Sequence, residues 1–277
     1  MKTTKLYFGG SRRVKRAARV IYKLSCLFVS VYLLSSCSAS YYAPGAHNVP
    51  LFQKKKEANI SGDYRIGNDT KGIDFQFAIA ATEHLGIIAN YSRYWGEESH
   101  YSLLSGITYA DYKYSSNTFE CGLGYFLPFA KSAVFEIYSG YGTNKLSSNS
   151  GEPMEYGITQ VHSNSFFIQP DIGFRKKHIE LAFSNRIRVN SYDKVSHKLG
   201  YETSYYGEES VLDQHPVVCF IEPAVTFRVG GEHVKFQIQA GRSILVSNNT
   251  YISYDPMNLN FGLIFRLGAK KAADPIQ

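Results

Sequence analysis

Cys37 is the residue whose type and position most clearly allow chemistry. The eleven apolar residues Leu24–Leu34 follow a basic stretch. Such a run is too short to span a bilayer and is typical of the apolar part of a signal peptide. Leu34-Ser35-Ser36-Cys37 then has the pattern of a bacterial lipobox, whose cysteine is diacylated on sulfur and becomes the new N-terminus. We expect a lipoprotein signal peptide over residues 1–36 and a lipidated Cys37, with an ordinary signal peptide as the alternative.

Few other residues are spaced for chemistry. His100-Tyr101-Ser102 spaces a histidine and a serine as in lipid A deacylase barrels, but in a predicted loop and without a clear acidic partner. The chain holds no nucleophile-elbow, phosphate-loop, zinc-protease or dinucleotide-binding motif, and no cysteine spacing for a metal. We expect no enzyme, no catalytic residue, no cofactor and no metal, and keep a lipid-modifying barrel enzyme as an alternative.

Two cysteines remain after Cys26 leaves with the signal peptide and Cys37 takes lipid: Cys121 and Cys219. They could form a disulfide in an oxidising compartment. They could also be two small apolar side chains on a lipid-facing surface, which is the interpretation we favour.

The net charge of +7 comes from the targeting segment. Residues 1–36 hold eight Lys and Arg and no acid, which leaves 22 basic and 23 acidic residues in the remainder. The mature chain is therefore nearly neutral. We expect no nucleic-acid partner, because no basic and aromatic patch accompanies this charge.

Apolar residues alternate with polar or small ones throughout the mature chain. In Ile73–Ala81, for example, Ile73, Phe75, Phe77 and Ile79 alternate with Asp74, Gln76, Ala78 and Ala80. This period of two predicts β-strands. We expect an all-β, antiparallel up-and-down transmembrane barrel of about ten strands, over segments 58–66, 73–81, 87–94, 119–125, 135–142, 166–174, 179–189, 217–228, 234–239 and 258–267.

The connections between these segments alternate in length. Four are tight: Thr82–Gly86, Pro128–Ser132, Arg175–Lys177 and Val229–Glu232. Four are longer: Gly96–Tyr112, Asn144–Glu155, Asn190–Gln214 and Asn248–Asp255. Short turns at one end and long loops at the other are typical of an outer-membrane barrel, with the turns in the periplasm.

Alternation alone does not say which face points inward. The polar face is rich in Gly, Ala and Gln and poor in Lys, which favours an apolar exterior over a soluble, lipocalin-like lipid-binding barrel. Its charges are nearly balanced, as a closed and paired lumen would need. The predicted lumen network comprises Asp74, Glu120, Glu136, Asp171, Glu180, Glu222, Arg186, Arg188, Arg228, Lys235 and Arg266.

The expected domain organisation is a signal peptide (1–36), a lipidated N-terminus and linker (37–56), a barrel (57–268) and a C-terminal tail (269–277). An even strand number returns the C-terminus to the periplasmic side. We expect the lipidated N-terminus there too, because no acid follows Cys37 as a surface-export signal. Pro170 and Pro223 fall inside predicted strands and indicate bulges or misplaced strand ends.

A stretch just after the lipobox resembles the uncharacterised outer-membrane β-barrel lipoproteins of the Bacteroidota. The residues are Tyr42-x-Pro44, Asn48-Val49-Pro50-Leu51-Phe52, Lys55-x-Glu57 and Gln76-x-Ala78-x-Ala80-x-Thr82-Glu83-His84-Leu85-Gly86. The resemblance covers roughly residues 34–92. It implies an outer-membrane barrel and brings no known activity or substrate.

The loops offer one functional hypothesis. They are rich in tyrosine and acid and could form a rim that binds an extracellular glycan or protein, or simply an aromatic girdle at the membrane interface. We expect membrane lipids as partners and a structural or surface-interaction role with a closed lumen; a narrow pore for small solutes is the alternative. The aromatic residues are Tyr94, Trp95, Tyr101, Tyr109, Tyr112, Tyr114, Tyr192, Tyr201, Tyr205 and Tyr206.

Overall fold

The structure is a computed structural model that describes residues 41–101, 108–152, 155–199, 217–247 and 252–268. The signal peptide, Cys37, the C-terminal tail and the side chains of His100 and Ser102 lie outside the described residues. The strands are β1 (Ala58–Gly67), β2 (Lys71–Ala80), β3 (Leu85–Tyr101), β4 (Thr108–Pro128), β5 (Ala133–Glu152), β6 (Glu155–Arg175), β7 (Ile179–Leu199), β8 (Val217–Gly230), β9 (Val234–Arg242), β10 (Ile244–Leu245) and β11 (Met257–Leu267).

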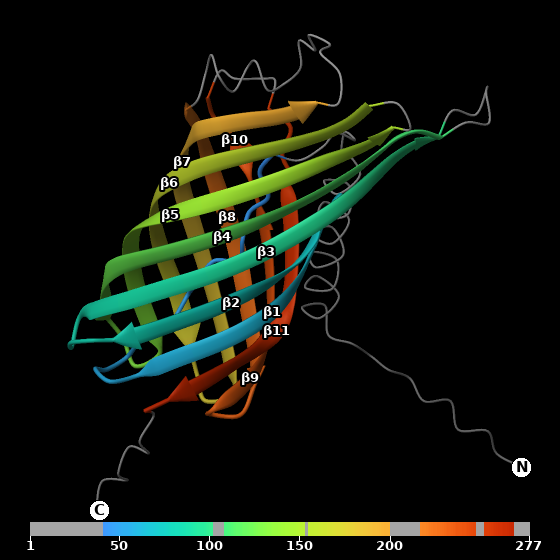
Figure 1. Cartoon of the computed structure of the whole chain (residues 1–277). Helices are drawn as coiled ribbons and strands as arrows, with labels where there is room; N and C mark the ends of the chain where they lie inside the picture. Colours follow the sequence, from blue (N-terminus) through green and yellow to red (C-terminus); the bar gives the residue numbers. More distant parts are fainter. Residues whose placement is uncertain (1–40, 102–107, 153–154, 200–216, 248–251, 269–277) are drawn as a thin grey trace, which may run out of the picture. The chain divides into compact units, whose positions relative to one another are not determined.

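The strands form one closed antiparallel barrel (Figure 1). Each of β1 to β8 pairs with the next strand in the chain, β8 pairs with β9, β9 with β11, and β11 returns to β1. The two residues of β10 pair with β8 in the same register as β9 does, so β9 and β10 are one strand interrupted at Ser243. The barrel therefore has ten strands, as the alternation predicted. The described part of the chain contains no helix long and apolar enough to cross a membrane.

The exterior of the barrel is apolar, and this excludes the lipocalin-like alternative. On every long strand, the large apolar side chains at the alternating positions predicted to face lipid are exposed. The polar side chains at the positions between them are buried. A soluble barrel would have the reverse arrangement, because water rather than lipid would surround it. The exposed set includes Phe75, Phe77, Phe119, Leu123, Tyr141, Phe166, Ile172, Leu181, Phe183, Phe227, Phe236, Leu263 and Phe265.

The two ends of the barrel differ, and we name them the turn end and the loop end. Tight connections at the turn end join β2 to β3, β4 to β5, β6 to β7 and β8 to β9. At the loop end β3 to β7 are 17 to 21 residues long, well beyond the roughly 9–11 that cross a bilayer. The described residues of the predicted loops Gly96–Tyr112 and Asn144–Glu155 are therefore strand, and β7 continues into the predicted loop Asn190–Gln214 as far as Leu199. Apolar alternation stops at the membrane surface, but backbone pairing continues past it.

Residues predicted to be a flexible linker instead run through the lumen. We name Tyr42–Phe52 the lumen segment; most of its residues are buried inside the barrel. The segment begins at the loop end, where Tyr42 bridges Tyr254, and the chain that follows it reaches the turn end, where the Lys56 N–H donates to the Ala80 carbonyl. The expectation that the lipidated N-terminus lies at the turn end concerns Cys37, outside the described residues; the first described residues, Tyr41 and Tyr42, lie at the loop end.

Both unexpected prolines coincide with interruptions of the ladder. The pairing of β6 with β7 skips Gln169 and Pro170 and resumes at Asp171. Pro223 lies beside the break between β9 and β10. Since proline has no N–H to donate, each is tolerated where the strand bonds are already interrupted.

Candidate functional site

The candidate site is the lumen itself, with the lumen segment bound in it. At the loop end the Tyr41 N–H donates to Ser253 (3.0 Å), and the Asp255 N–H donates to the Tyr42 carbonyl (2.8 Å). The Tyr42 ring stacks on Phe220 with centroids 4.5 Å apart. The segment is thus fixed at the loop end by backbone bonds and an aromatic contact.

In the middle of the barrel, side chains of the wall bind the backbone of the segment. Gln239 accepts from the His47 N–H (2.6 Å) and donates to the His47 carbonyl (2.9 Å). Gln76 donates to the Ala46 carbonyl (2.9 Å), and Gln169 donates to the Asn48 carbonyl (2.9 Å). These amides give the segment the partners that a neighbouring strand would otherwise supply. Of the buried inner-face glutamines, Gln76, Gln169 and Gln239 thus bind the segment, whereas Gln237 contacts Arg228 and Asp63.

At the turn end one carboxylate binds two consecutive peptide groups. Glu136 on β5 accepts from the N–H groups of Leu51 (2.9 Å) and Phe52 (2.8 Å). Arg175 donates to the Leu51 carbonyl (2.9 Å). Leu51 has φ of 55°, a left-handed conformation that costs a leucine about 1–2 kcal/mol. The wall bonds therefore hold the segment in a turn that it would not favour alone.

Apolar packing completes this end of the lumen. Phe52 is fully buried among inward-facing residues that include Phe126 and Phe167, and Leu51 contacts the wall near Ala182. A Cβ at Gly173 would lie 2.3 Å from the Leu51 side chain. The small residues of the inner face thus leave room for the segment.

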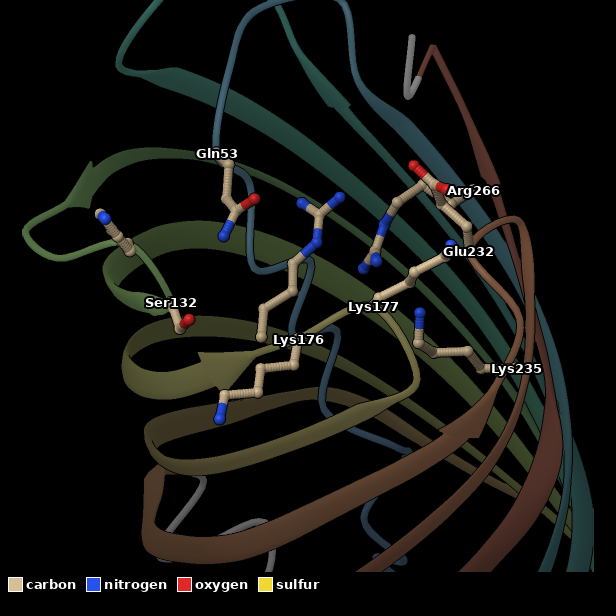
Figure 2. Close-up of a pocket in the computed structure, with 9 residues that line it drawn as sticks. Gln53, Ser132, Lys176, Lys177, Glu232, Lys235 and Arg266 are labelled. Atoms are coloured by element: carbon tan, nitrogen blue, oxygen red, sulfur yellow. The ribbon is translucent and has the colours of Figure 1, made fainter. Parts of the chain in front are cut away.

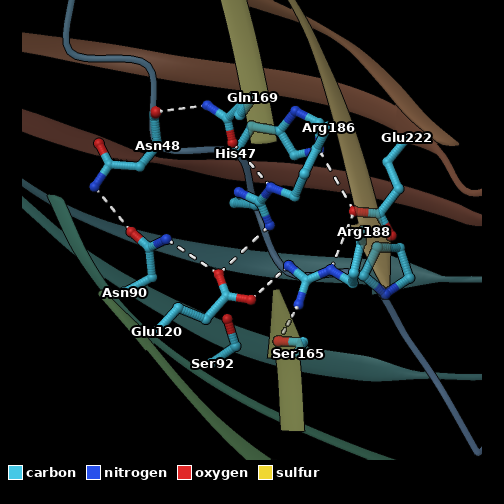
Figure 3. A network of polar contacts seen from close by, with 12 residues as sticks. His47, Asn48, Asn90, Ser92, Glu120, Ser165, Gln169, Arg186, Arg188 and Glu222 are labelled. Atoms are coloured by element: carbon cyan, nitrogen blue, oxygen red, sulfur yellow. Dashed lines mark hydrogen bonds and ion pairs between the residues drawn. The ribbon is translucent and has the colours of Figure 1, made fainter. Parts of the chain in front are cut away.

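A first charge network surrounds Glu120 on β4 (Figure 3). Glu120 pairs with two arginines of β7, Arg186 (3.5 Å) and Arg188 (2.5 Å). Arg188 also reaches Glu222 on β8 (3.5 Å), whose carboxylate lies 4.0 Å from the His47 ring. The wall charges therefore pair with one another around the segment.

A second network surrounds Glu180 on β7, near the turn end. Four cations approach this buried carboxylate: Arg266 (2.5 Å), Arg228 (3.2 Å), Lys235 (3.3 Å) and Arg175 (3.8 Å). A carboxylate and its cations buried together avoid the large cost of an unpaired charge. This network joins strands that are distant in sequence.

A cavity of about 350 Å³ lies at the turn end (Figure 2). Gln53 directly follows the lumen segment, so the cavity lies where the segment leaves the lumen. Cations dominate its lining, although Glu57 neutralises Arg175 at 2.7 Å. The lining residues are Gln53, Lys131, Ser132, Arg175, Lys176, Lys177, Glu232, Lys235 and Arg266.

The chain just after the lumen segment is also tied to a turn outside the membrane-spanning strands. The Lys55 ammonium lies 2.9 Å from the Glu83 carboxylate in the turn between β2 and β3. The hydrogen bond from Lys55 lowers the pKa of the Glu83 carboxyl. Both side chains are more than half exposed, so this pair contributes little to stability.

The eleven residues of the predicted lumen network all lie buried in the lumen. The structure groups Glu120 and Glu222 with arginines of β7, and Glu180 with its four cations. The near balance of charges suggested that the lumen acids pair with bases, but Glu136 instead accepts hydrogen bonds from the lumen segment. Asp74 likewise accepts from the Ala46 N–H (3.3 Å), and Asp171 accepts from Gln169. Backbone and amide donors therefore take the place of cations there.

Sequence reasoning missed four buried charges and the segment. Asp63 and Arg65 share the inward parity of β1, but the alternation there is weak. Glu57 and Asp255 lie just outside strands, where parity carries no information. The only available signal for the segment was its low charge and two prolines, which equally describe a linker.

Three tyrosines assigned to a possible binding rim are buried instead. Tyr94, Tyr114 and Tyr192 belong to an apolar cluster with Tyr42 and Phe220 at the loop end of the lumen. They cannot contact an external ligand from there. Trp95, in contrast, is 38 % exposed. The side chains of the remaining rim residues, Tyr101, Tyr109, Tyr112, Tyr201, Tyr205 and Tyr206, lie outside the described part of the chain.

The described residues offer little for redox or metal chemistry. Cys121 and Cys219 are free, with Cys121 exposed on the outer face. Among the side chains that the structure describes, no three His, Cys, Asp or Glu residues are grouped to hold a metal ion. The arrangement binds a peptide segment and pairs charges.

The class of protein follows from these features. A closed antiparallel barrel with an apolar exterior and a charged interior is a transmembrane β-barrel of the outer-membrane type, because closure pairs every strand within the lipid. In this one, the chain's own N-terminal segment occupies the lumen.

Comparison with known proteins adds only structural likeness. No protein-family model and no curated protein matches the chain. Solved structures with a similar fold include a major outer membrane protein of Thermus thermophilus (TM-score 0.40, 10% identity, 76% of this chain and 99% of that one). Another is an outer membrane channel of Pseudomonas putida (TM-score 0.38, 8% identity, 81% of this chain and 100% of that one). A third is the outer membrane protease OmpT of Escherichia coli (TM-score 0.36, 10% identity, 77% of this chain and 94% of that one). Likenesses this distant carry no argument about function.

Proposed function

We propose that this protein is an outer-membrane lipoprotein barrel with a closed lumen and a structural or surface-interaction role. The observation that supports it is the lumen segment, which lies buried along the barrel from the loop end to the turn end. A diffusion pore needs a continuous water-filled path. Here the path is filled by a peptide whose backbone is bonded to the wall.

The proposed partners follow from the two exposed surfaces. Membrane lipids surround the apolar exterior and receive the acyl chains of Cys37. The extensions of β3 to β7 beyond the membrane offer a surface for an extracellular glycan or protein. We propose no nucleic-acid partner and no catalytic role.

The resemblance to Bacteroidota barrel lipoproteins is part of this proposal. Two of its motifs, Tyr42-x-Pro44 and Asn48–Phe52, fall in the lumen segment. Most of these residues are buried, so the stretch that carries the resemblance coincides with the part of the chain that docks in the lumen. We propose membership of that family on this basis.

Planar-bilayer conductance tests the closed lumen. The wild-type barrel is expected to give no stable conductance steps, whereas a variant lacking residues 45–51 should give them. Because so large a deletion can impair folding, Phe52→Ala serves as a milder variant that loosens the packing at the turn end. Leu263→Ala, on the lipid-facing surface, is the matched control and should stay silent.

Stable steps from the wild type would refute the closed lumen and favour the narrow pore. If the deletion variant is correctly folded and gives no conductance, the side chains of the barrel wall, rather than the lumen segment, block the lumen. The interaction role is tested separately by a photo-crosslinker at Trp95, followed by identification of what is captured on intact cells. Capture of no partner other than lipid would contradict that role.

A further inference from the structure

The direction in which the lumen segment runs has a consequence for the membrane anchor. The chain passes through the barrel once before its first strand begins. Tyr42 lies at the loop end and Lys56 at the turn end, and β1 then returns toward the loop end. The first described residues, Tyr41 and Tyr42, therefore lie at the loop end.

The loop end is the extracellular end by the usual asymmetry of these barrels. Outer-membrane barrels have short turns in the periplasm and longer connections outside. Here the tight turns 81–84, 129–132, 176–178 and 231–233 share the turn end, while β3 to β7 extend beyond the membrane at the other (Figure 1). Tyr42 thus lies on the extracellular side.

Chain length excludes a periplasmic position for Cys37. Five peptide units separate Cys37 from Tyr42, and they reach at most about 18 Å when fully extended. The hydrocarbon core is about 30 Å thick. The lumen offers no return path, because the lumen segment itself occupies it. Acyl chains on Cys37 therefore cannot reach the periplasmic leaflet.

The segment also enters at the low side of the barrel wall. Tyr41 and Tyr42 bond to Ser253 and Asp255, which precede β11. The Asp255 carboxylate accepts in turn from the Asn68 N–H (3.1 Å), in the short turn between β1 and β2. On this side of the barrel β1, β2 and β11 have only 10 or 11 residues each, so the wall does not extend beyond the membrane as β3 to β7 do. The entry point is thus near the outer surface of the bilayer.

We infer that the N-terminus of the mature protein lies at the cell surface and that the lipid on Cys37 is inserted in the outer leaflet. The fold places Tyr41 and Tyr42 at the loop end; the position of the mature N-terminus and the lipid both rest on the proposed processing and lipidation at Cys37. The barrel is then held by its strands and by an anchor that enters the membrane from outside. Assembly must close the barrel around the segment or thread the segment before β1 pairs with β11.

Cysteine labelling on intact cells tests the topology. In a Cys121→Ser, Cys219→Ser background, Ser40→Cys provides a thiol just before the described segment. Lys131→Cys in a turn-end connection and Asn149→Cys near the loop end of β5 are the matched controls. A membrane-impermeant maleimide is expected to label Ser40→Cys and Asn149→Cys on intact cells, and Lys131→Cys only after permeabilisation.

Labelling of Ser40→Cys only after permeabilisation, with Asn149→Cys labelled on intact cells, would overturn the inference. Mass spectrometry of the mature N-terminus is measured in parallel. If the N-terminus carries no acyl group but Ser40→Cys is labelled on intact cells, the proposed lipid anchor is refuted and the surface position is retained. An acylated N-terminus that is shielded would keep the proposed lipoprotein and refute the surface position. Normal heat-modifiable migration confirms that each variant has folded.

Discussion

Replacing Glu136 by leucine should release the turn end of the lumen segment. The substitution leaves the N–H groups of Leu51 and Phe52, bound at 2.9 and 2.8 Å, without their acceptor. Each buried unsatisfied group costs about 1–3 kcal/mol, which makes about 2–6 kcal/mol together. Relaxation of the left-handed Leu51 returns about 1–2 kcal/mol. The difference between these two ranges runs from about 0 to about 5 kcal/mol, and its midpoint gives an expected net loss of about 2.5 kcal/mol in docking of the segment.

Hydrogen exchange read by mass spectrometry measures this loss on a peptide that covers residues 48–53. Since each 1.4 kcal/mol is about tenfold, a loss of about 2.5 kcal/mol should make exchange in Glu136→Leu roughly sixty-fold faster than in the wild type. Glu136→Gln keeps one acceptor oxygen and should fall between Glu136→Leu and the wild type. Ile137→Ala, on the neighbouring outward-facing position, is the control and should leave this peptide protected. Unchanged protection in a folded Glu136→Leu barrel would refute the reasoning.

Three further perturbations test other parts of the structure. Arg188→Ala removes the cation that links the buried carboxylates of Glu120 and Glu222, and should lower the free energy of unfolding by about 3–5 kcal/mol. Arg186→Ala should lower it by less, because Glu120 keeps the nearer arginine, Arg188. Equal urea midpoints of unfolding for the two variants would contradict this ranking. Gly124→Val would place a Cβ 2.2 Å from the ring of the buried Tyr138. This overpacking should lower the free energy of unfolding by about 1–3 kcal/mol, and the barrel should unfold at a lower temperature in a heat-modifiability assay. An unchanged temperature would show that the side chains in the lumen can rearrange to make room. Protease added to intact cells should cut within 200–216 and spare 176–178; the opposite pattern would invert the topology.

The sequence by itself determined the wall of the barrel. Alternation with period two specifies which residues point outward, since a shift by one residue would expose every charged side chain to lipid. Phe75 and Leu263 are exposed on the outside, and Glu120 and Arg186 are buried inside, as that pattern requires. The number of strands could also be predicted from the sequence, because a connection containing turn-forming residues separates each alternating segment from the next. The membrane ends of the strands were visible, but their continuation into water was not, because apolar alternation stops where lipid stops.

Only the tertiary structure decided what fills the lumen. The backbone of the lumen segment has no periodic pattern, and its partners are amides and carboxylates contributed by strands far away in sequence, such as Gln239 to His47 and Glu136 to Leu51. A backbone N–H or carbonyl is the same for every residue type, so no pattern of side chains reveals which wall residue will bind it. The same reason explains why Glu136 looked like a partner for an arginine. The end of the barrel at which Tyr42 lies was likewise decided by the path of the segment through the closed barrel.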